Sequence, residues 1–157
     1  MRKGILLLLF LACLQSCGPG RVAQTPLGNP SSSDDPGPAG AVAVVRRYYE
    51  AIQRRDFPQA YRLWEGEGEA SGQTFEDFAA GFAETSSVEI EIGAPGRVEG
   101  AAGSRYIEIP VRLKATTKDG QAQSFRGKYV LRRSVVDGAS AEQRAWHIYS
   151  ADITRLK

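Results

Sequence analysis

Apolar residues recur at intervals of three and four from residue 41 onward. The segment AVAVVRRYYEAIQRR carries them at Val42, Val45, Tyr49 and Ile52. This spacing predicts an amphipathic helix. Two shorter helices are expected after it, one starting behind Asp56 as N-cap and one starting behind Thr74.

The period changes to strict alternation after residue 86. The segments SVEIEIG and YIEIPVRLK alternate apolar with charged residues, which predicts half-buried strands. Residues 118–120 (KDG) predict a hairpin turn into QSFRGKYVLRR, and residues 141–156 predict a last strand. Pro110 lacks a backbone donor and Gly127 lacks a side chain, so each marks an edge, bulge or bend of a curved sheet.

Three helices followed by about four antiparallel strands predict an α+β fold with the helices on one face of the sheet. This order, with the phrase VVRRYYEAIQRRDFPQAYRLW and the closing AWHIYSADI, resembles the NTF2-like superfamily over residues 41–157. The resemblance implies a cone of three N-terminal helices packed on the curved sheet, with an apolar pocket inside. The expected pocket residues are Tyr48, Tyr49, Phe78, Phe82, Tyr129, Trp146 and Asp152.

An apolar run, LLLLFLACLQSC, follows Arg2 and Lys3 near the start of the chain. It is shorter than the about 20 residues that a bilayer of about 30 Å requires, so it predicts an export signal. LQSC resembles the lipobox of bacterial lipoproteins, which implies a signal peptide at 1–16 and a lipidated first mature residue, Cys17. The alternative is an ordinary secretory signal that leaves Cys17 as a free thiol.

Lipidation implies an address in the bacterial cell envelope. An aspartate after the cysteine retains such lipoproteins in the inner membrane; Gly18 stands there instead, so we expect the outer membrane, facing the periplasm. Residues 17–40 are rich in Pro, Gly, Ser and Asp without an apolar period, which predicts a disordered tether to one globular domain at 41–157.

Charge and composition exclude several classes of function. The chain has 20 Lys and Arg against 18 Asp and Glu, and loss of the signal peptide leaves 18 of each, so no nucleic-acid partner is expected. His147 is the single histidine and is expected on the outside of the sheet. The glutamates of EGEGE (65–69) lack the pattern of a calcium loop, so no metal or cofactor is expected and the segment is interpreted as a mobile flap.

The remaining question is whether the pocket is catalytic. If the last strand alternates strictly, Asp152 faces inward beside Tyr48 and Tyr49, as in NTF2-like isomerases and dehydratases; a bulge near Ser150 would turn it outward and Ile153 inward. We expect the bulge and assign no catalytic residue. The predicted function is a lipid-anchored envelope protein that binds a small apolar ligand or a protein partner without catalysis. The alternatives are a pocket enzyme and a structural adaptor; the NTF2-like resemblance implies that the adaptor forms homodimers through the outer face of the sheet.

Overall fold

The computed structural model describes residues 35–157. The predicted signal peptide (1–16), Cys17 and residues 18–34 of the predicted tether lie outside the described residues. No helix in the described range is both long and apolar enough to cross a membrane.

The predicted helices are present and begin where their caps indicate. Helix α1 spans Pro38–Gln53, α2 spans Phe57–Arg62 and α3 spans Phe75–Gly81, with a short 3-10 turn, η1 (Glu69–Ser71), before α3. Asp56 and Thr74 accept the backbone N–H of Gln59 and Asp77 at 3.1 and 3.2 Å, as N-caps do. Helix α1 begins at Pro38, three residues before the predicted boundary at Ala41. Proline is favoured at the first helical position because its missing N–H would have no partner in the helix there.

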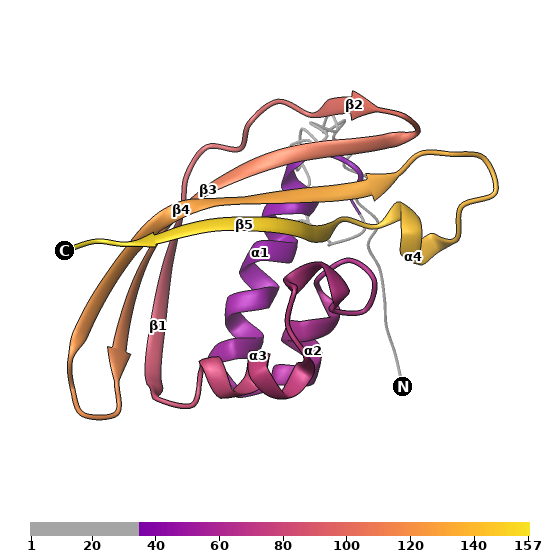
Figure 1. The fold of residues 1–157 in the computed structure, drawn as a ribbon. Coiled ribbons are helices and arrows are strands. Elements are labelled where there is room, and N and C mark those ends of the chain that lie inside the picture. The colour runs from indigo at the N-terminus through magenta and orange to yellow at the C-terminus, as the bar shows by residue number, and fades with distance from the viewer. Residues whose placement is uncertain (1–34) are drawn as a thin grey trace, which may run out of the picture.

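The second half of the described chain forms one antiparallel sheet (Figure 1). Its strands are β1 (Thr85–Ile92), β2 (Glu99–Ala101), β3 (Ser104–Thr117), β4 (Ala122–Ser134) and β5 (His147–Arg155), in the order β1-β3-β4-β5. The short β2 pairs only with β3 and adds a fifth strand to the four expected. The predicted turn is present, with Gly120 at a positive φ of 84°.

The predicted start of the last strand, at residue 141, is wrong. Residues 141–144 form a short helix, α4 (Ala141–Arg144), and the strand starts only at His147. The reason is a capping box: Ser140 accepts the N–H of Gln143, whose side chain accepts the N–H of Ser140.

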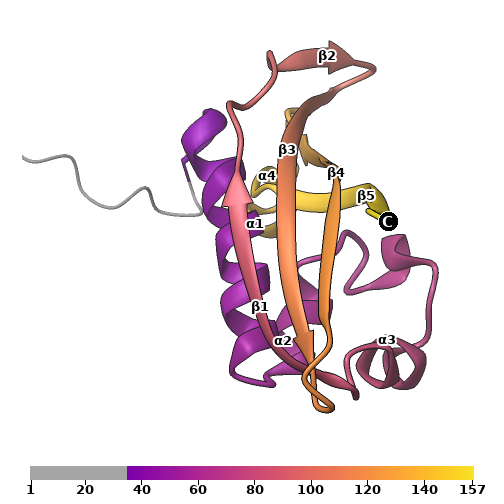
Figure 2. The ribbon, with the colours of Figure 1, turned by 90° about the vertical axis from the view of Figure 1, so that its left-hand side faces the viewer.

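The helices cover one face of the sheet, which we call the inner face (Figures 1 and 2). Helix α1 runs across it, α2 packs beside α1, and α3 packs beside α2. The alternating apolar residues of β1 and β3 point into the core, as predicted. The largest fully buried side chains are Trp146, Ile107, Ile109, Leu131, Ile148, Val44 and Val45.

Pro110 and Gly127 are diagonal neighbours on β3 and β4. Pro110 lies just beyond the end of β1, where its missing N–H breaks no ladder, and its carbonyl accepts the N–H of Gly93 at 2.8 Å. A Cβ on Gly127 would lie 1.9 Å from the carbonyl oxygen of Asp152. Only glycine allows β5 to approach β4 this closely.

Candidate functional site

Aromatic rings fill the space between α1 and the sheet. The ring of Tyr48, on α1, is the centre of the cluster; its centroid lies 5.1 to 6.3 Å from four other ring centroids. Those four belong to Tyr49, Trp64, Phe78 and Tyr129. Edge-to-face contacts of this kind stabilise a core, and all five side chains are buried. We call these five residues the aromatic cluster.

The structure brings most of the predicted pocket residues together. Tyr48, Tyr49, Phe78 and Tyr129 belong to the aromatic cluster, and the partly exposed Phe82 packs against Phe78 at 5.3 Å. Trp146 is buried elsewhere: its indole N–H donates to the carbonyl of Gly37 at 3.1 Å, and Arg133 lies 5.7 Å from its ring.

The polar atoms of the cluster are neutral phenols. The hydroxyls of Tyr49 and Tyr129 lie 2.6 Å apart and share a hydrogen bond. Burial raises the pKa of Tyr48, Tyr49 and Tyr129 above the usual 10.0, because a phenolate would lose its hydration there. These groups therefore donate and accept hydrogen bonds but do not serve as bases near neutral pH.

Trp64 is a cluster residue that sequence reasoning missed. Its Nε1 is buried and has no hydrogen bond of normal geometry within residues 35–157. The indole nonetheless lies near enough to Tyr48 to lower the pKa of that phenol slightly against the larger effect of burial. Trp64 reaches the cluster because the chain after α2 pairs with β5 in parallel at Ile148.

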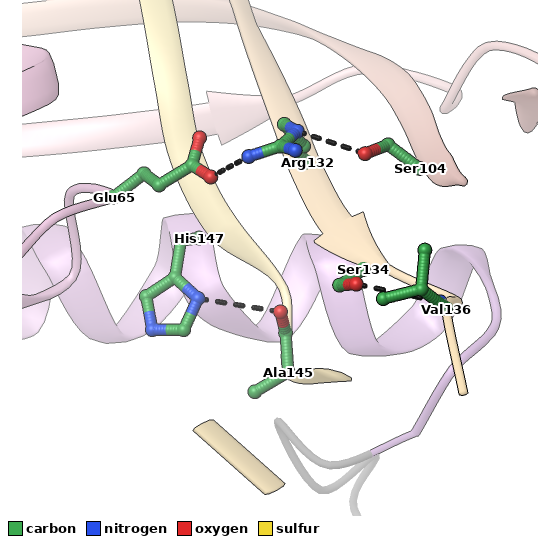
Figure 3. A network of polar contacts seen from close by, with 7 residues as sticks. All are labelled: Glu65, Ser104, Arg132, Ser134, Val136, Ala145 and His147. Atoms are coloured by element: carbon green, nitrogen blue, oxygen red, sulfur yellow. Dashed lines mark hydrogen bonds and ion pairs between the residues drawn. The ribbon is translucent and has the colours of Figure 1, made fainter. Parts of the chain in front are cut away.

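Residues 63–72, which follow α2, close one end of the helical layer against the sheet. Ile148 donates its N–H to Leu63 and accepts the N–H of Glu65, both at 2.9 Å. Glu65 then forms an ion pair with Arg132 on β4, whose Nε donates to Ser104 Oγ at 3.0 Å (Figure 3). The predicted flap is thus fastened to the sheet at Glu65, the first glutamate of EGEGE.

Asp152 lies outside the aromatic cluster. The ladder between β4 and β5 pairs Val130 with Ser150 but Leu131 with Ile148, so Tyr149 is an extra, bulged residue. Asp152 is therefore exposed on the outer face opposite Lys128, and Ile153 is half-buried on the inner face. Placing Asp152 in the pocket was wrong, and the expected bulge is confirmed one residue before Ser150.

His147 lies on the outer face, as predicted, but its ring is largely covered. Only 15% of the side chain is exposed. Its Nε2 lies 2.8 Å from Glu142 Oε1 on α4. Its Nδ1 lies 3.2 Å from the carbonyl of Ala145, as Figure 3 shows. Helix α4, absent from the sequence prediction, provides this cover. Within residues 35–157, no group of three His, Cys, Asp or Glu side chains lies close enough to hold a metal ion.

A hollow of about 570 Å³ lies on the outer face of the sheet. Its residues come from β1, β3, β4 and β5 and include Glu91, Pro110, Arg112, Arg126, Asp152 and Thr154. We call it the outer-face hollow. Arg112 and Arg126 are directly opposite each other across β3 and β4, with Glu91 beside Arg112 and Thr154 beside Arg126.

Neither Arg112 nor Arg126 has an ion pair or a side-chain hydrogen bond among the described residues. Like charges directly opposite on a sheet destabilise it, so this pair weakens the fold locally. Such a local cost is typical of a binding surface. Sequence reasoning missed the pair, although counting six residues either side of the turn at 118–120 would have brought Arg112 and Arg126 into register.

Comparison with solved structures identifies the architecture. The chain aligns with an NTF2-like superfamily protein from Salmonella enterica serovar Typhimurium at 14% identity and a TM-score of 0.50, over 72% of this chain and 86% of that one. The chain has an NTF2-like fold.

Two further solved structures align with similar identities and TM-scores. A proposed dehydratase of the NTF2-like family from Streptomyces avermitilis aligns at 14% identity and a TM-score of 0.52, over 75% of this chain and 95% of that one. A proposed aromatic ring hydroxylase from Novosphingobium aromaticivorans aligns at 17% identity and a TM-score of 0.54, over 74% and 87%. No family model and no curated protein matches the sequence. These identities establish the NTF2-like fold alone.

Proposed function

We propose that this protein is a lipid-anchored, non-catalytic adaptor of the bacterial cell envelope, which binds a protein partner through the outer-face hollow. The observation that carries the proposal is the unpaired couple Arg112 and Arg126 inside that hollow. Two guanidinium groups side by side suit a partner that presents carboxylates, because each can bind a carboxylate with two hydrogen bonds.

The interior supports binding over catalysis. The polar groups of the aromatic cluster are neutral phenols and one indole, and the carboxylate with the best claim to a catalytic role, Asp152, lies on the outer face. The alternative function, an isomerase or dehydratase of the NTF2-like type, needs a general base facing the substrate. The described residues that line the cluster include no carboxylate and no histidine.

A small apolar ligand is the second candidate. The observations in its favour are the rings around Trp64, which suit an apolar guest, and the buried Nε1 of Trp64, which has no hydrogen bond of normal geometry in the described chain and is available to one acceptor atom of that guest. Such a ligand has to displace Tyr48 or Trp64 from the packed cluster, so it binds only if residues 63–72 swing away from β5.

The anchor is tested by Cys17→Ser. The lipid chains on Cys17 are the proposed membrane attachment, so the variant should move from the detergent phase to the aqueous phase on phase separation. Metabolic labelling with a palmitate analogue should mark the parent chain and not the variant. A variant that stays in the membrane fraction would contradict the anchor. Labelled parent chain in the outer-membrane fraction would support the expected address.

The partner site is tested by photo-crosslinking from position 154 in intact cells. We expect one discrete adduct, whose yield falls at least tenfold when both arginines are reversed (Arg112→Glu with Arg126→Glu), because two charge-assisted contacts are lost. Lys114→Glu is the matched control, since Lys114 is an exposed cation of the same face outside the hollow. An adduct equally sensitive to both changes, or insensitive to both, would contradict recognition by the hollow.

A further inference from the structure

The two edges of the sheet are treated differently. At the β1 edge, side chains from the end of α1 cap exposed carbonyls: Gln53 donates to Val88, and Arg55 donates to Thr85 at 2.6 Å. At the β5 edge, η1 packs against the strand, but among residues 35–157 the edge backbone is hydrogen-bonded only at Ile148, to Leu63 and Glu65. Capped edges resist pairing with another chain, whereas open edges invite it.

The open part of the β5 edge is defined by three residues. Leu156 donates its N–H to Ser124, so the backbone groups of Leu156 point toward β4. Because these groups alternate along a strand, those of Arg155, Ile153 and Ala151 point away from β4. Within residues 35–157, the outward-pointing N–H and C=O groups of these three residues have no hydrogen-bond partner. We call Ala151, Ile153 and Arg155 the open edge.

We infer that the open edge pairs with the open edge of a second copy of this chain, antiparallel and centred on Ile153. In this register Ile153 faces Ile153 of the other copy, and Ala151 faces Arg155. All the outward backbone groups of the open edge are then used, and Asp152 faces the neutral Thr154. The pairing joins two sheets into one continuous sheet of eight strands plus the two short β2 strands.

Other symmetric registers fit less well. Centring on Arg155 places two guanidinium groups opposite each other, and centring on Ala151 places Ile153 opposite the bulged Tyr149. Centring on Asp152 places two carboxylates opposite each other, and centring on Thr154 places the apolar Ile153 opposite the charged Arg155. The register on Ile153 also covers that half-buried apolar side chain with its own counterpart. These features favour a second copy over an unrelated extended peptide.

The experiment measures dimerisation of the full chain in density-matched detergent by sedimentation equilibrium. We expect a reversible, concentration-dependent dimer. Ala151→Lys places a cation opposite Arg155 twice per dimer and should weaken dimerisation about tenfold, whereas Ala151→Glu should strengthen it by a similar factor. Adding Arg155→Glu to Ala151→Lys should restore the parent affinity. Ala101→Lys and Ala101→Glu are matched controls, because Ala101 is an exposed strand alanine on β2.

A second measurement fixes the register. In a chain whose two cysteines are replaced by serine, Ile153→Cys should form a reducible dimer on mild oxidation, because paired strand residues lie about 5.5 Å apart. Ala101→Cys should stay monomeric. A monomer at every concentration overturns the inference, as does a dimer that responds alike to both charges at position 151. An edge that binds extended peptides without dimerising also overturns it. The arginine reversals in the outer-face hollow leave this dimer intact, so the two proposals fail separately.

Discussion

The two faces of the sheet differ in how completely their polar and charged groups are paired. On the inner face, rings pack on rings, the hydroxyls of Tyr49 and Tyr129 satisfy each other, and ionisable groups other than phenols are absent from the buried residues of the described chain. On the outer face, charged side chains line the strands. Arg112 lies opposite Arg126, and neither forms an ion pair with a carboxylate among the described residues. The difference teaches that close packing lies on the inner face, whereas charged side chains without ion pairs lie on the outer one.

The largest expected effect is at Trp146, on the inner side. Its side chain is 2% exposed and fills the space between the start of α1 and β5. Trp146→Ala should lower the free energy of unfolding by about 3 to 5 kcal/mol, because the backbone cannot close so large a cavity. Urea denaturation measures this. Tyr149→Ala, at a ring 46% exposed, is the control and should change the midpoint little. Equal losses of stability in the two variants would contradict the larger contribution of the inner face to stability.

The buried phenols should make the protein sensitive to alkali. Their pKa values are raised in the folded state, so the unfolded chain releases protons first as the pH rises. The contribution of these phenols to folding stability is fully present below about pH 10, which is the pKa of tyrosine in the unfolded chain. It is lost as the pH rises further. We expect phenolate absorbance from Tyr48, Tyr49 and Tyr129 to appear only together with unfolding. Gradual ionisation of the whole set in a folded protein would contradict their burial.

A smaller effect is expected where residues 63–72 cross to the sheet. Glu65→Gln removes the ion pair with Arg132, whose groups are about a third exposed, so the loss should be about 1 kcal/mol or less. Hydrogen exchange should accelerate in residues 64–72 and not in β3. Glu67→Gln is the control, since Glu67 forms no ion pair within residues 35–157. Faster exchange in both variants would show that the ion pair does not hold the segment.

The smallest effect is expected at Asp152. It is exposed on the outer face, so Asp152→Asn should change the free energy of unfolding by no more than about 0.5 kcal/mol. A clearly stabilised variant would mean that the carboxylate is buried at a cost, as a catalytic base in the cone would be. Thermal denaturation of the two chains at neutral pH decides between these outcomes.

Local signals in the sequence predicted most of the fold. Asp56 and Thr74 mark helix starts because a cap needs only a side chain and an N–H three residues on. Pro110 and Gly127 lie where a backbone donor and a side chain, respectively, are not needed or not tolerated, as the chemistry of each residue type indicates. The capping box at Ser140 and Gln143 was also readable, but the apolar residues beyond it hid the short helix.

The candidate sites depended on contacts that no local pattern encodes. Glu65 and Arg132 are 67 residues apart in the chain and meet because the segment after α2 pairs with β5. The face of Asp152 depended on one bulged residue, Tyr149, and a single added residue exchanges the two faces of a strand. Whether Cys17 carries lipid stays a prediction.

The hydrogen bond from Trp146 to Gly37 has a consequence for how the chain folds. It joins residues 109 positions apart, and it fastens the first turn of α1 to the segment that enters the last strand. A growing chain therefore cannot complete this contact until nearly all of it has been synthesised. Such long-range closure slows folding relative to a helical bundle of equal size. We expect the nascent domain to stay open until its last strand has left the ribosome.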